Sequence, residues 1–191
     1  GTRPHAPAAR RPTTARYHPG MTQRTRSPRV EVSAAASAPD LDLARELFRE
    51  YAASLPFSLC FQGFDEELAT LPGKYASPAG EILIARDHTG PLGCVAVRPI
   101  DPLPGDPADA RPVCEMKRLY VRPAARGKGA GRALCDRLIA DARAMGYRTM
   151  KLDSEPDFDA AVGLYRSLGF VPIDRYNDDP HPQTIYLGLR L

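Results

Sequence analysis

Cysteine is scarce in this sequence of 191 residues, and the four cysteines lie far apart. They form no Cys-x-x-Cys pair and have no histidine cluster beside them, which argues against a zinc site and a disulfide framework. We therefore expect reduced thiols and a cytoplasmic protein. The four are Cys60, Cys94, Cys114 and Cys135. No apolar run approaches the ~20 residues that a membrane-spanning helix needs, so no membrane partner is expected.

Acidic residues are absent from positions 1–28, which carry six arginines. Taking those six from the 26 lysines and arginines leaves 20 against 23 acids, a net charge of −3 for the rest of the chain. The segment is rich in Pro, Arg, Thr and Ala without hydrophobic periodicity. We predict a disordered basic leader over 1–28, with Met21 as a candidate natural start, and one folded domain over 29–191. A basic tail can bind nucleic acid or anionic lipid, but we favour a solvated leader and expect no clear nucleic-acid partner.

Helix and strand patterns begin at Arg29. A capping box from Ser37 to Asp40 begins a helix that Pro56 ends. Gly146 and Gly169 each mark the end of a later helix. Further helices are predicted over 65–71, 130–145 and 157–168, and strands over 30–32, 81–86, 92–97, 113–121, 148–152, 170–173 and 184–189. This order predicts an α/β (α+β) chain in which helices flank a mixed sheet.

A glycine-rich loop, Arg-Gly-Lys-Gly-Ala-Gly-Arg over 126–132, joins the strand predicted at 113–121 to the next helix. Glycines let the backbone approach a ligand, and the free N–H groups and dipole of a helix's first turn favour an anion, best a phosphate. Arg126, Lys128 and Arg132 add positive charge. A P-loop signature is absent, and a dinucleotide fingerprint fails because its last Gly or Ala is missing.

The spacing Arg126-x-x-Gly129-x-Gly131 is similar to the Arg/Gln-x-x-Gly-x-Gly/Ala signature of the GNAT acetyltransferases. The Leu-Tyr-Val-Arg-Pro segment before it and the Leu-Tyr and Leu-Gly-Phe elements around Tyr165 resemble the same family, so the resemblance spans 29–191. It implies the GNAT fold: a mixed, mostly antiparallel sheet of six to seven strands, about four helices, and a V-shaped splay between the central strands. It also implies acetyl-coenzyme A (acetyl-CoA) as co-substrate and no metal. The residues implied to bind acetyl-CoA are Leu119, Tyr120, Val121, Arg126, Gly127, Lys128, Gly129, Ala130, Gly131 and Arg132.

Glu115 is the candidate catalytic base. An amine with a pKa near ~10 must lose a proton at neutral pH before it attacks a thioester. In related enzymes a glutamate at this place takes that proton, often through water. Strand alternation would put Glu115, Lys117, Leu119 and Val121 on one face. The alternatives are a glutamate that is ion-paired with Lys117 or an arginine, and a water chain as the base.

Tyr165 is the candidate general acid. A departing thiolate, whose thiol has a pKa near ~8.5, benefits from a proton or a hydrogen bond, and the family's tyrosine at this place lies close to the sulfur. The alternative is an aromatic core residue, since Phe158, Val162 and Tyr165 form one stripe of a helix. The family often has Asn where Phe158 stands, so a further polar contact to the cofactor arm is not expected. Without a Ser/His/Asp arrangement, we expect direct transfer in a ternary complex.

The resemblance predicts an N-acetyltransferase that moves an acetyl group from acetyl-CoA to a primary amine of a small molecule or peptide. A non-catalytic acyl-CoA-binding regulatory module and a nucleotide-binding domain are the alternatives. The phenylalanines of 56–64 could line an acceptor pocket or fill the core, and Asp174, Asp178 and Asp179 could form an acidic rim or an ordinary turn. A homodimer through the closing strands is also implied.

Overall fold

A single seven-stranded sheet organises the chain from Arg29 onward, in the order β1-β2-β3-β4-β5-β7-β6. The computed structural model describes residues 1–2, 29–59 and 63–191, so the predictions for the leader, Cys60 and Phe61 fall almost wholly outside the described residues. The strands are β1 (Glu31–Ala34), β2 (Glu81–Asp87), β3 (Gly90–Ile100), β4 (Val113–Val121), β5 (Thr149–Ser154), β6 (Val171–Pro172) and β7 (Ile185–Arg190). All neighbours are antiparallel except β4 and β5, which run parallel. The predicted mixed, mostly antiparallel sheet is confirmed.

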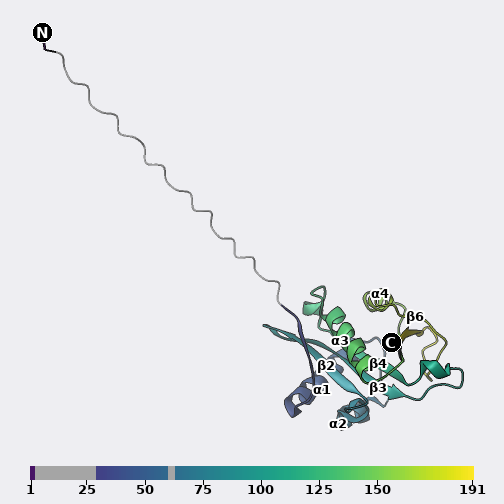
Figure 1. Cartoon of the computed structure of the whole chain (residues 1–191). Helices are drawn as coiled ribbons and strands as arrows, with labels where there is room; N and C mark the ends of the chain where they lie inside the picture. The colour runs from purple at the N-terminus through teal and green to yellow at the C-terminus, as the bar shows by residue number, and fades with distance from the viewer. Residues whose placement is uncertain (3–28, 60–62) are drawn as a thin grey trace.

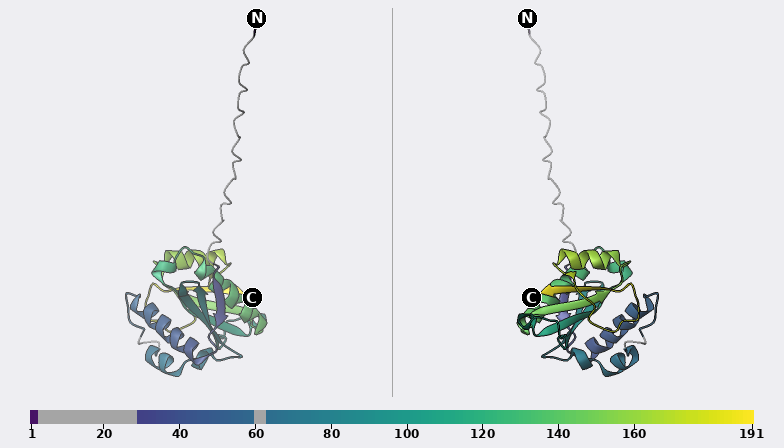
Figure 2. Two further views of the ribbon diagram at one scale, coloured as in Figure 1. Left: turned by 90° about the vertical axis from the view of Figure 1, so that its left-hand side faces the viewer. Right: turned by 90° about the vertical axis from the view of Figure 1, so that its right-hand side faces the viewer.

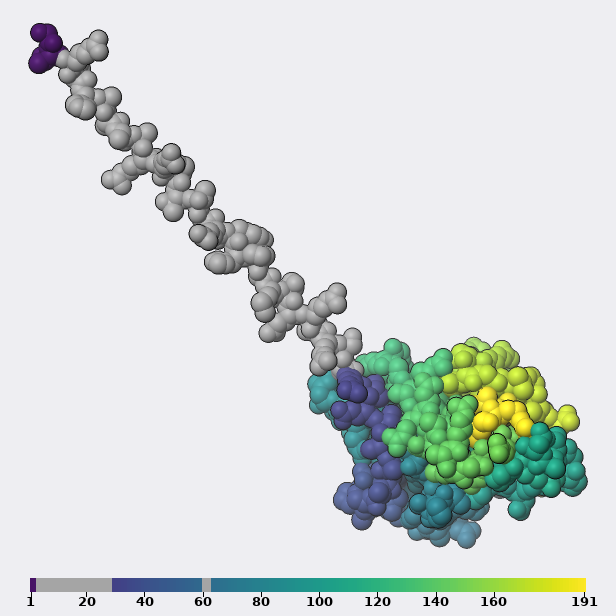
Figure 3. Space-filling view, in the orientation of Figure 1, coloured from purple at the N-terminus to yellow at the C-terminus, as the bar shows by residue number. Residues whose placement is uncertain are grey.

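Helices cover both faces of the sheet (Figures 1 and 2). In the described chain these are α1 (Ala38–Ala53), α2 (Phe64–Thr70), α3 (Ala130–Ala144) and α4 (Asp159–Ser167), with short 3-10 turns η2 (Gly73–Tyr75), η3 (Ala108–Ala110) and η4 (Pro123–Ala125). α1 and α2 lie on one face, and α3 and α4 on the other. In the space-filling view of Figure 3, α3 (green) covers the centre of its face with α4 (yellow-green) beside it. Among the described residues, no helix combines the length and apolar character needed to cross a bilayer.

The two faces of the sheet bury separate cores. On the face of α3 and α4, Leu134, Leu138 and Tyr165 pack against the strands. On the face of α1 and α2, Leu47 and Phe48 do the same. Each helix therefore docks through one apolar stripe, as its sequence pattern predicts.

The predicted start of α1 is confirmed in atomic detail. The Ser37 hydroxyl accepts the N–H of Asp40 at 3.3 Å, and the Asp40 carboxylate accepts the N–H of Ser37 at 3.3 Å. These reciprocal bonds satisfy two N–H groups that the first turn cannot pair internally.

A β-bulge in β4 overturns the predicted alternation along this strand. Cys94 pairs with Tyr120 and Ala96 with Lys117, so Val95 alone stands opposite Arg118 and Leu119. Arg118 takes a φ of 60°, a left-handed conformation that is uncommon for a residue with a side chain. After this extra residue, each side chain of β4 points to the face of the sheet opposite to the one that strict alternation predicts.

The bulge separates the side chains that alternation groups together. Leu119 and Val121 pack against the core under α3, which also holds Met116. Glu115 and Lys117 precede the bulge and point to the opposite face. The prediction that these four residues share one face is therefore wrong beyond Lys117.

The parallel pair β4 and β5 separates at the middle of the sheet. Pairing runs from Val113↔Thr149 to Glu115↔Lys151 and goes no further, although β4 continues to Val121 and β5 to Ser154. The edge of β4 from Met116 to Val121 that faces β5 therefore has no strand partner in the described chain. This is the predicted V-shaped splay.

Candidate active site

A groove of about 690 Å³ opens where β4 ends and α3 begins. Its walls come from the end of β4, the glycine-rich loop, the first turns of α3 and α4, and the end of α1. The positions predicted to bind acetyl-CoA all line this groove except Lys128, which is exposed on the outside of the loop. Segments far apart in sequence thus build one elongated site.

The glycine-rich loop presents unpaired backbone N–H groups to the groove. Gly127 and Gly129 take φ values of 75° and 83°, so the turn requires residues without a side chain to strain. The N–H of Arg126 bonds to Pro123 O and that of Ala133 to Gly129 O. Between them, the described chain offers no acceptor to the N–H groups of 127–132. Such a row of N–H groups at a helix N-terminus is suited to a phosphate or pyrophosphate.

Two arginines add positive charge to the same end of the groove. Arg126 donates through Nε to the carbonyl of Val121 at 3.3 Å, which holds its side chain along the end of β4. Arg132 donates to the Ser167 hydroxyl at 2.8 Å. Both guanidinium groups line the groove, so an anion at the loop would meet side-chain as well as backbone donors.

A smaller cavity of about 70 Å³, the inner cavity, continues the groove into the splay. Leu119, Phe158 and Ala161 line both spaces. The inner cavity also meets Phe57, so this phenylalanine lines a pocket, whereas Phe64 is buried in the core beside α2. Beyond the apolar entrance the walls become charged, because Lys117, Arg118, Asp153, Glu155 and Asp179 contribute to them.

Tyr165 lines the inner cavity. Its ring is 7% exposed and packs beside Phe170, with the ring centroids 5.8 Å apart. Burial raises the pKa of Tyr165 well above its ordinary value, so the hydroxyl stays protonated at neutral pH. Within the described chain this hydroxyl makes no hydrogen bond, although Tyr165 lines the inner cavity. A protonated donor without a partner among the described residues is available to a ligand there.

This geometry agrees with the comparisons to known proteins. The Acetyltransferase (GNAT) family matches residues 43–170. The chain belongs to the GNAT family. An uncharacterized N-acetyltransferase of Schizosaccharomyces pombe is 40% identical over 163 residues, which are 85% of this chain and 95% of that protein. A second, from Dictyostelium discoideum, is 28% identical over 79% of this chain and 94% of its own length. The fold of yncA of Salmonella typhimurium, solved with its cofactor acetyl-CoA, matches with a TM-score of 0.64 at 21% identity, covering 84% of this chain and 93% of that one.

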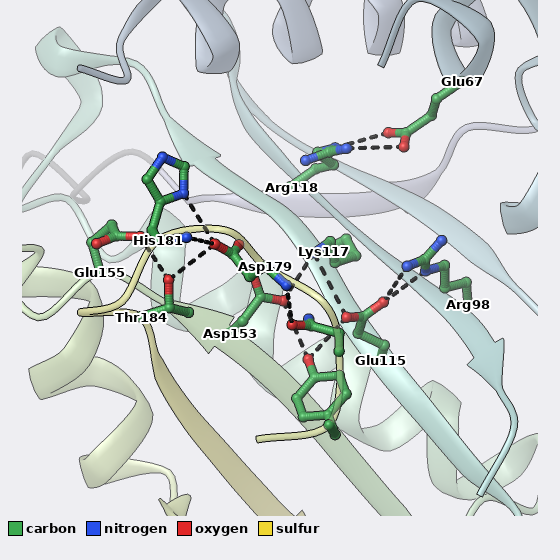
Figure 4. Close-up of polar contacts among 12 residues, drawn as sticks. Glu67, Arg98, Glu115, Lys117, Arg118, Asp153, Glu155, Asp179, His181 and Thr184 are labelled. Carbon is green, nitrogen blue, oxygen red and sulfur yellow. Dashed lines mark hydrogen bonds and ion pairs between the residues drawn. The ribbon is translucent and has the colours of Figure 1, made fainter. Parts of the chain in front are cut away.

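Glu115 of this GNAT chain lies in a buried charge cluster (Figure 4). Its side chain is 1% exposed, and Oε2 accepts from Arg98 Nε and Nη2, each at 2.7 Å. Lys117 Nζ lies 3.6 Å from Oε1, which also accepts the Tyr176 hydroxyl at 2.9 Å. The glutamate is thus paired with Lys117 and an arginine, and it does not line the inner cavity that Tyr165 lines.

Asp153 connects this cluster to the inner cavity. Lys117 Nζ lies 2.9 Å from its Oδ1, and the Tyr176 hydroxyl lies 3.2 Å from the same oxygen. Burial disfavours its charged form, but the positive charge of Lys117 and the hydrogen bonds from Lys117 and Tyr176 outweigh it, so the pKa of Asp153 is lowered. For Tyr176, burial and then the charges of Glu115 and Asp153 raise the pKa, so its phenol stays protonated.

A cavity of about 200 Å³, the polar cavity, lies beyond the inner cavity. The two share Lys117, Arg118 and Asp179 as lining residues. Asp178 also lines the polar cavity, while Asp174 is exposed and lines neither. Two of the three aspartates considered for an acidic rim therefore reach a pocket.

Several residues of this region were missed from sequence. Tyr176 is 61 residues after Glu115, and nothing in its local pattern shows that the β6–β7 loop (residues 173–184) folds over the splay. The available signal was charge inside apolar strands: Arg98 on β3, Lys117 on β4 and Asp153 on β5 stand where a core strand would carry apolar residues. Buried charges need partners, so such positions indicate a cluster. The described residues hold no group of three or more His, Cys, Asp or Glu placed to bind a metal ion.

Proposed function

We propose that this GNAT protein transfers an acetyl group from acetyl-CoA to a primary amine, of a small molecule or peptide, in a ternary complex without a covalent acyl-enzyme. The observation that carries the proposal is a series of three adjoining spaces at the splay. The groove shares lining residues with the inner cavity, and the inner cavity shares lining residues with the polar cavity. Acetyl-CoA and the amine can therefore meet from opposite sides at the unpaired edge of β4.

The groove residues divide the work of holding acetyl-CoA. The free N–H groups of 127–132, with Arg126 and Arg132, would hold the pyrophosphate. The unpaired edge of β4 near Leu119 and Val121 offers N–H and C=O groups to an extended arm, as a neighbouring strand would. The thioester then lies at the inner cavity beside Tyr165. A family neighbour solved with acetyl-CoA supports the choice of co-substrate.

Tyr165 would assist the leaving group. The amine nitrogen forms a bond to the carbonyl carbon, the C–S bond breaks, and the thiolate receives the Tyr165 proton or hydrogen bond. A hydroxyl that burial keeps protonated suits this donor role.

The proton that the amine loses would pass to Glu115 indirectly. Asp153 lines the inner cavity, and the Tyr176 hydroxyl lies within hydrogen-bond distance of both Asp153 and Glu115. We propose that these groups, with water in the inner cavity, relay the proton, and that Glu115 is the anion at the end of this path. Its contacts with Arg98 and Lys117 keep it from touching the amine directly.

Calorimetric titration with acetyl-CoA, with NAD and ATP as controls, tests the co-substrate. Micromolar binding of acetyl-CoA alone is expected, and NAD binding of equal strength would favour a nucleotide-binding domain instead. Release of free coenzyme A in the presence of an amine library then separates the enzyme from a non-catalytic acyl-CoA-binding regulatory module. Tight binding without release for any amine would support the regulatory module. A cytoplasmic location and a homodimer through β6 and β7 stay predictions, and light scattering tests the second.

A further inference from the structure

Charges of both signs line the polar cavity. The cations are Lys74, Arg98, Lys117 and Arg118, and the anions are Glu67, Asp178 and Asp179. Arg118 is held by Glu67 through two contacts of 2.8 and 2.9 Å, so these two charges offset one another. Of the remaining charged residues, Asp179 and Lys117 also line the inner cavity, whereas Lys74, Arg98 and Asp178 do not.

Asp179 stands at the end next to the thioester position. It is 7% exposed and lines both the polar and the inner cavity. Its Oδ1 accepts the backbone N–H of His181 at 2.8 Å, and lies 3.0 Å from His181 Nδ1 and 3.3 Å from the Thr184 hydroxyl (Figure 4). Its Oδ2 makes no hydrogen bond in the described chain. A carboxylate that is more than nine-tenths buried, lines two cavities and has one oxygen without a hydrogen-bond partner among the described residues is suited to receive an ammonium or amine N–H.

Arg98 stands away from the thioester position. It lines the polar cavity and an adjacent cavity of about 210 Å³ but not the inner cavity. Its Nε and Nη2 bind Glu115, while Nη1 makes no hydrogen bond among the described residues. Its side chain remains 23% exposed. Lys74, on η2, lines the same cavity and has no partner in the described chain. Both groups can donate to an anion in the polar cavity.

We infer that the acceptor is a small zwitterion whose amine nitrogen lies near a carboxylate, as in an α-amino acid. The nitrogen lies at Asp179 facing the thioester, and the carboxylate lies at Arg98 and Lys74. A polyamine would place a second cation against these two cations, and a plain alkylamine would leave them unpaired. The carboxylate is unchanged in the reaction: the N–C bond forms, the C–S bond breaks, and the amine proton leaves through the relay. The inference rests on the proposed function and adds its substrate class.

Matched acceptors test the carboxylate directly. Each of L-alanine, L-leucine and L-phenylalanine is compared with its carboxamide and with the amine that lacks the carboxyl group. Coenzyme A release gives kcat/KM for each. In at least one set we expect kcat/KM for the amino acid to exceed kcat/KM for both analogues by about 10- to 100-fold, which is the effect expected of a charge-assisted hydrogen bond to a carboxylate. Equal use of all three members in every set would overturn the inference while leaving the acetyltransferase proposal standing.

Two substitutions connect that preference to the named residues. Lys74→Gln changes an exposed side chain and should lower kcat/KM for the amino acid by about 3- to 10-fold. Arg98→Lys keeps a cation beside Glu115 but loses the planar fork, and about a 10-fold loss is expected. In both variants the ratio of kcat/KM for the amino acid to kcat/KM for the amine that lacks the carboxyl group should fall, whereas Arg143→Gln, on the exposed side of α3, should change kcat/KM for neither acceptor. An unaltered preference in both variants would overturn the assignment.

A binding measurement separates the two proposals. Each amino acid and its carboxamide are titrated by calorimetry into protein saturated with coenzyme A, so the result does not depend on turnover. Tighter binding of the amino acid without acetyl transfer would support the zwitterion site and count against the enzyme. Acetyl transfer to amines, without tighter binding of any amino acid than of its carboxamide, would support the enzyme and count against the zwitterion site.

Discussion

The Tyr165 hydroxyl combines two properties at the scale of one residue: burial keeps it protonated, and it has no hydrogen-bond partner in the described chain. Tyr165→Phe removes only the oxygen and leaves the ring in the core. We expect kcat to fall about 10- to 100-fold, the range of a lost proton donor, while the Kd for acetyl-CoA changes less than about 3-fold. Stopped-flow turnover and calorimetry measure the two. Equal losses of kcat and affinity would show that Tyr165 is a packing residue.

Glu115 is a residue whose surroundings limit what it can do. Glu115→Gln keeps its shape but removes the charge opposite Arg98 and Lys117, so we expect both a lower free energy of unfolding, by about 3 kcal/mol, and a lower kcat for acetyl transfer. The kcat measured under conditions where the variant is folded is the deciding measurement, because a purely structural glutamate would lower stability without lowering turnover. Glu31→Gln, at an exposed position of β1, is the matched control.

At the scale of elements, the sequence predicts what local signals determine. The capping box, Pro56, Gly146 and Gly169 set the helix ends, and every predicted helix and strand is present with ends shifted by a few residues. The β4 bulge is missed because strict alternation assumes that each residue of β3 stands opposite one residue of β4. The Tyr176 contact is missed because it joins distant segments. The glycine-rich loop can be recognised from the sequence because its glycines and arginines lie within one short segment.

The first turn of α3 can be altered without disturbing the fold. A Cβ on Gly131 would meet Leu164 and Val121 at 3.5 and 3.6 Å, which is ordinary contact. Gly131→Glu should therefore fold, but its carboxylate would lie beside the N–H groups proposed for the pyrophosphate. The affinity for acetyl-CoA should fall at least about 100-fold in Gly131→Glu. It should fall less in Gly131→Gln, which has a similar size but no charge, so the difference between the two variants measures the effect of the charge. Calorimetry checks affinity, and identical losses in both variants would mean that bulk decides.

Gly93 allows β3 to approach the bulged part of β4. A Cβ there would lie 2.1 Å from the carbonyl oxygen of Tyr120, so Gly93→Ala forces the two strands apart. We expect the free energy of unfolding to fall by about 1–3 kcal/mol, together with weaker acetyl-CoA binding, because the end of β4 lines the groove. Gly105→Ala is the control, since nothing lies within 4 Å of its added Cβ. Chemical denaturation measures both, and equal stabilities would contradict the close approach.

At the scale of the whole molecule, a carboxyl pair joins the sheet to the α3 layer and makes stability depend on pH. Burial, then the hydrogen bond and charge of Asp141, raises the pKa of Glu81 from 4.5 to about 7 against the opposing charge of Arg137. Glu81 Oε2 is buried with no donor in the described chain, as expected of two carboxyl groups that need a shared proton.

The direction of the pH effect follows from this raised pKa. The folded state holds the Glu81 proton more tightly than the unfolded chain, so the contribution to stability is full below about pH 4.5 and is lost as the pH rises to about 7. Glu81→Gln keeps a donor toward Asp141 at every pH. The free energy of unfolding of the variant should therefore lose this dependence on pH. Above pH 7 it should exceed that of the parent protein by about 1 kcal/mol, a value discounted because the carboxyl group is partly exposed. Thermal unfolding from pH 4 to pH 8 measures the difference, with Glu31→Gln expected to follow the parent curve. A Glu81→Gln curve parallel to that of the parent would mean that folding does not change the pKa of Glu81, and that some other contact holds α3 to the start of β2.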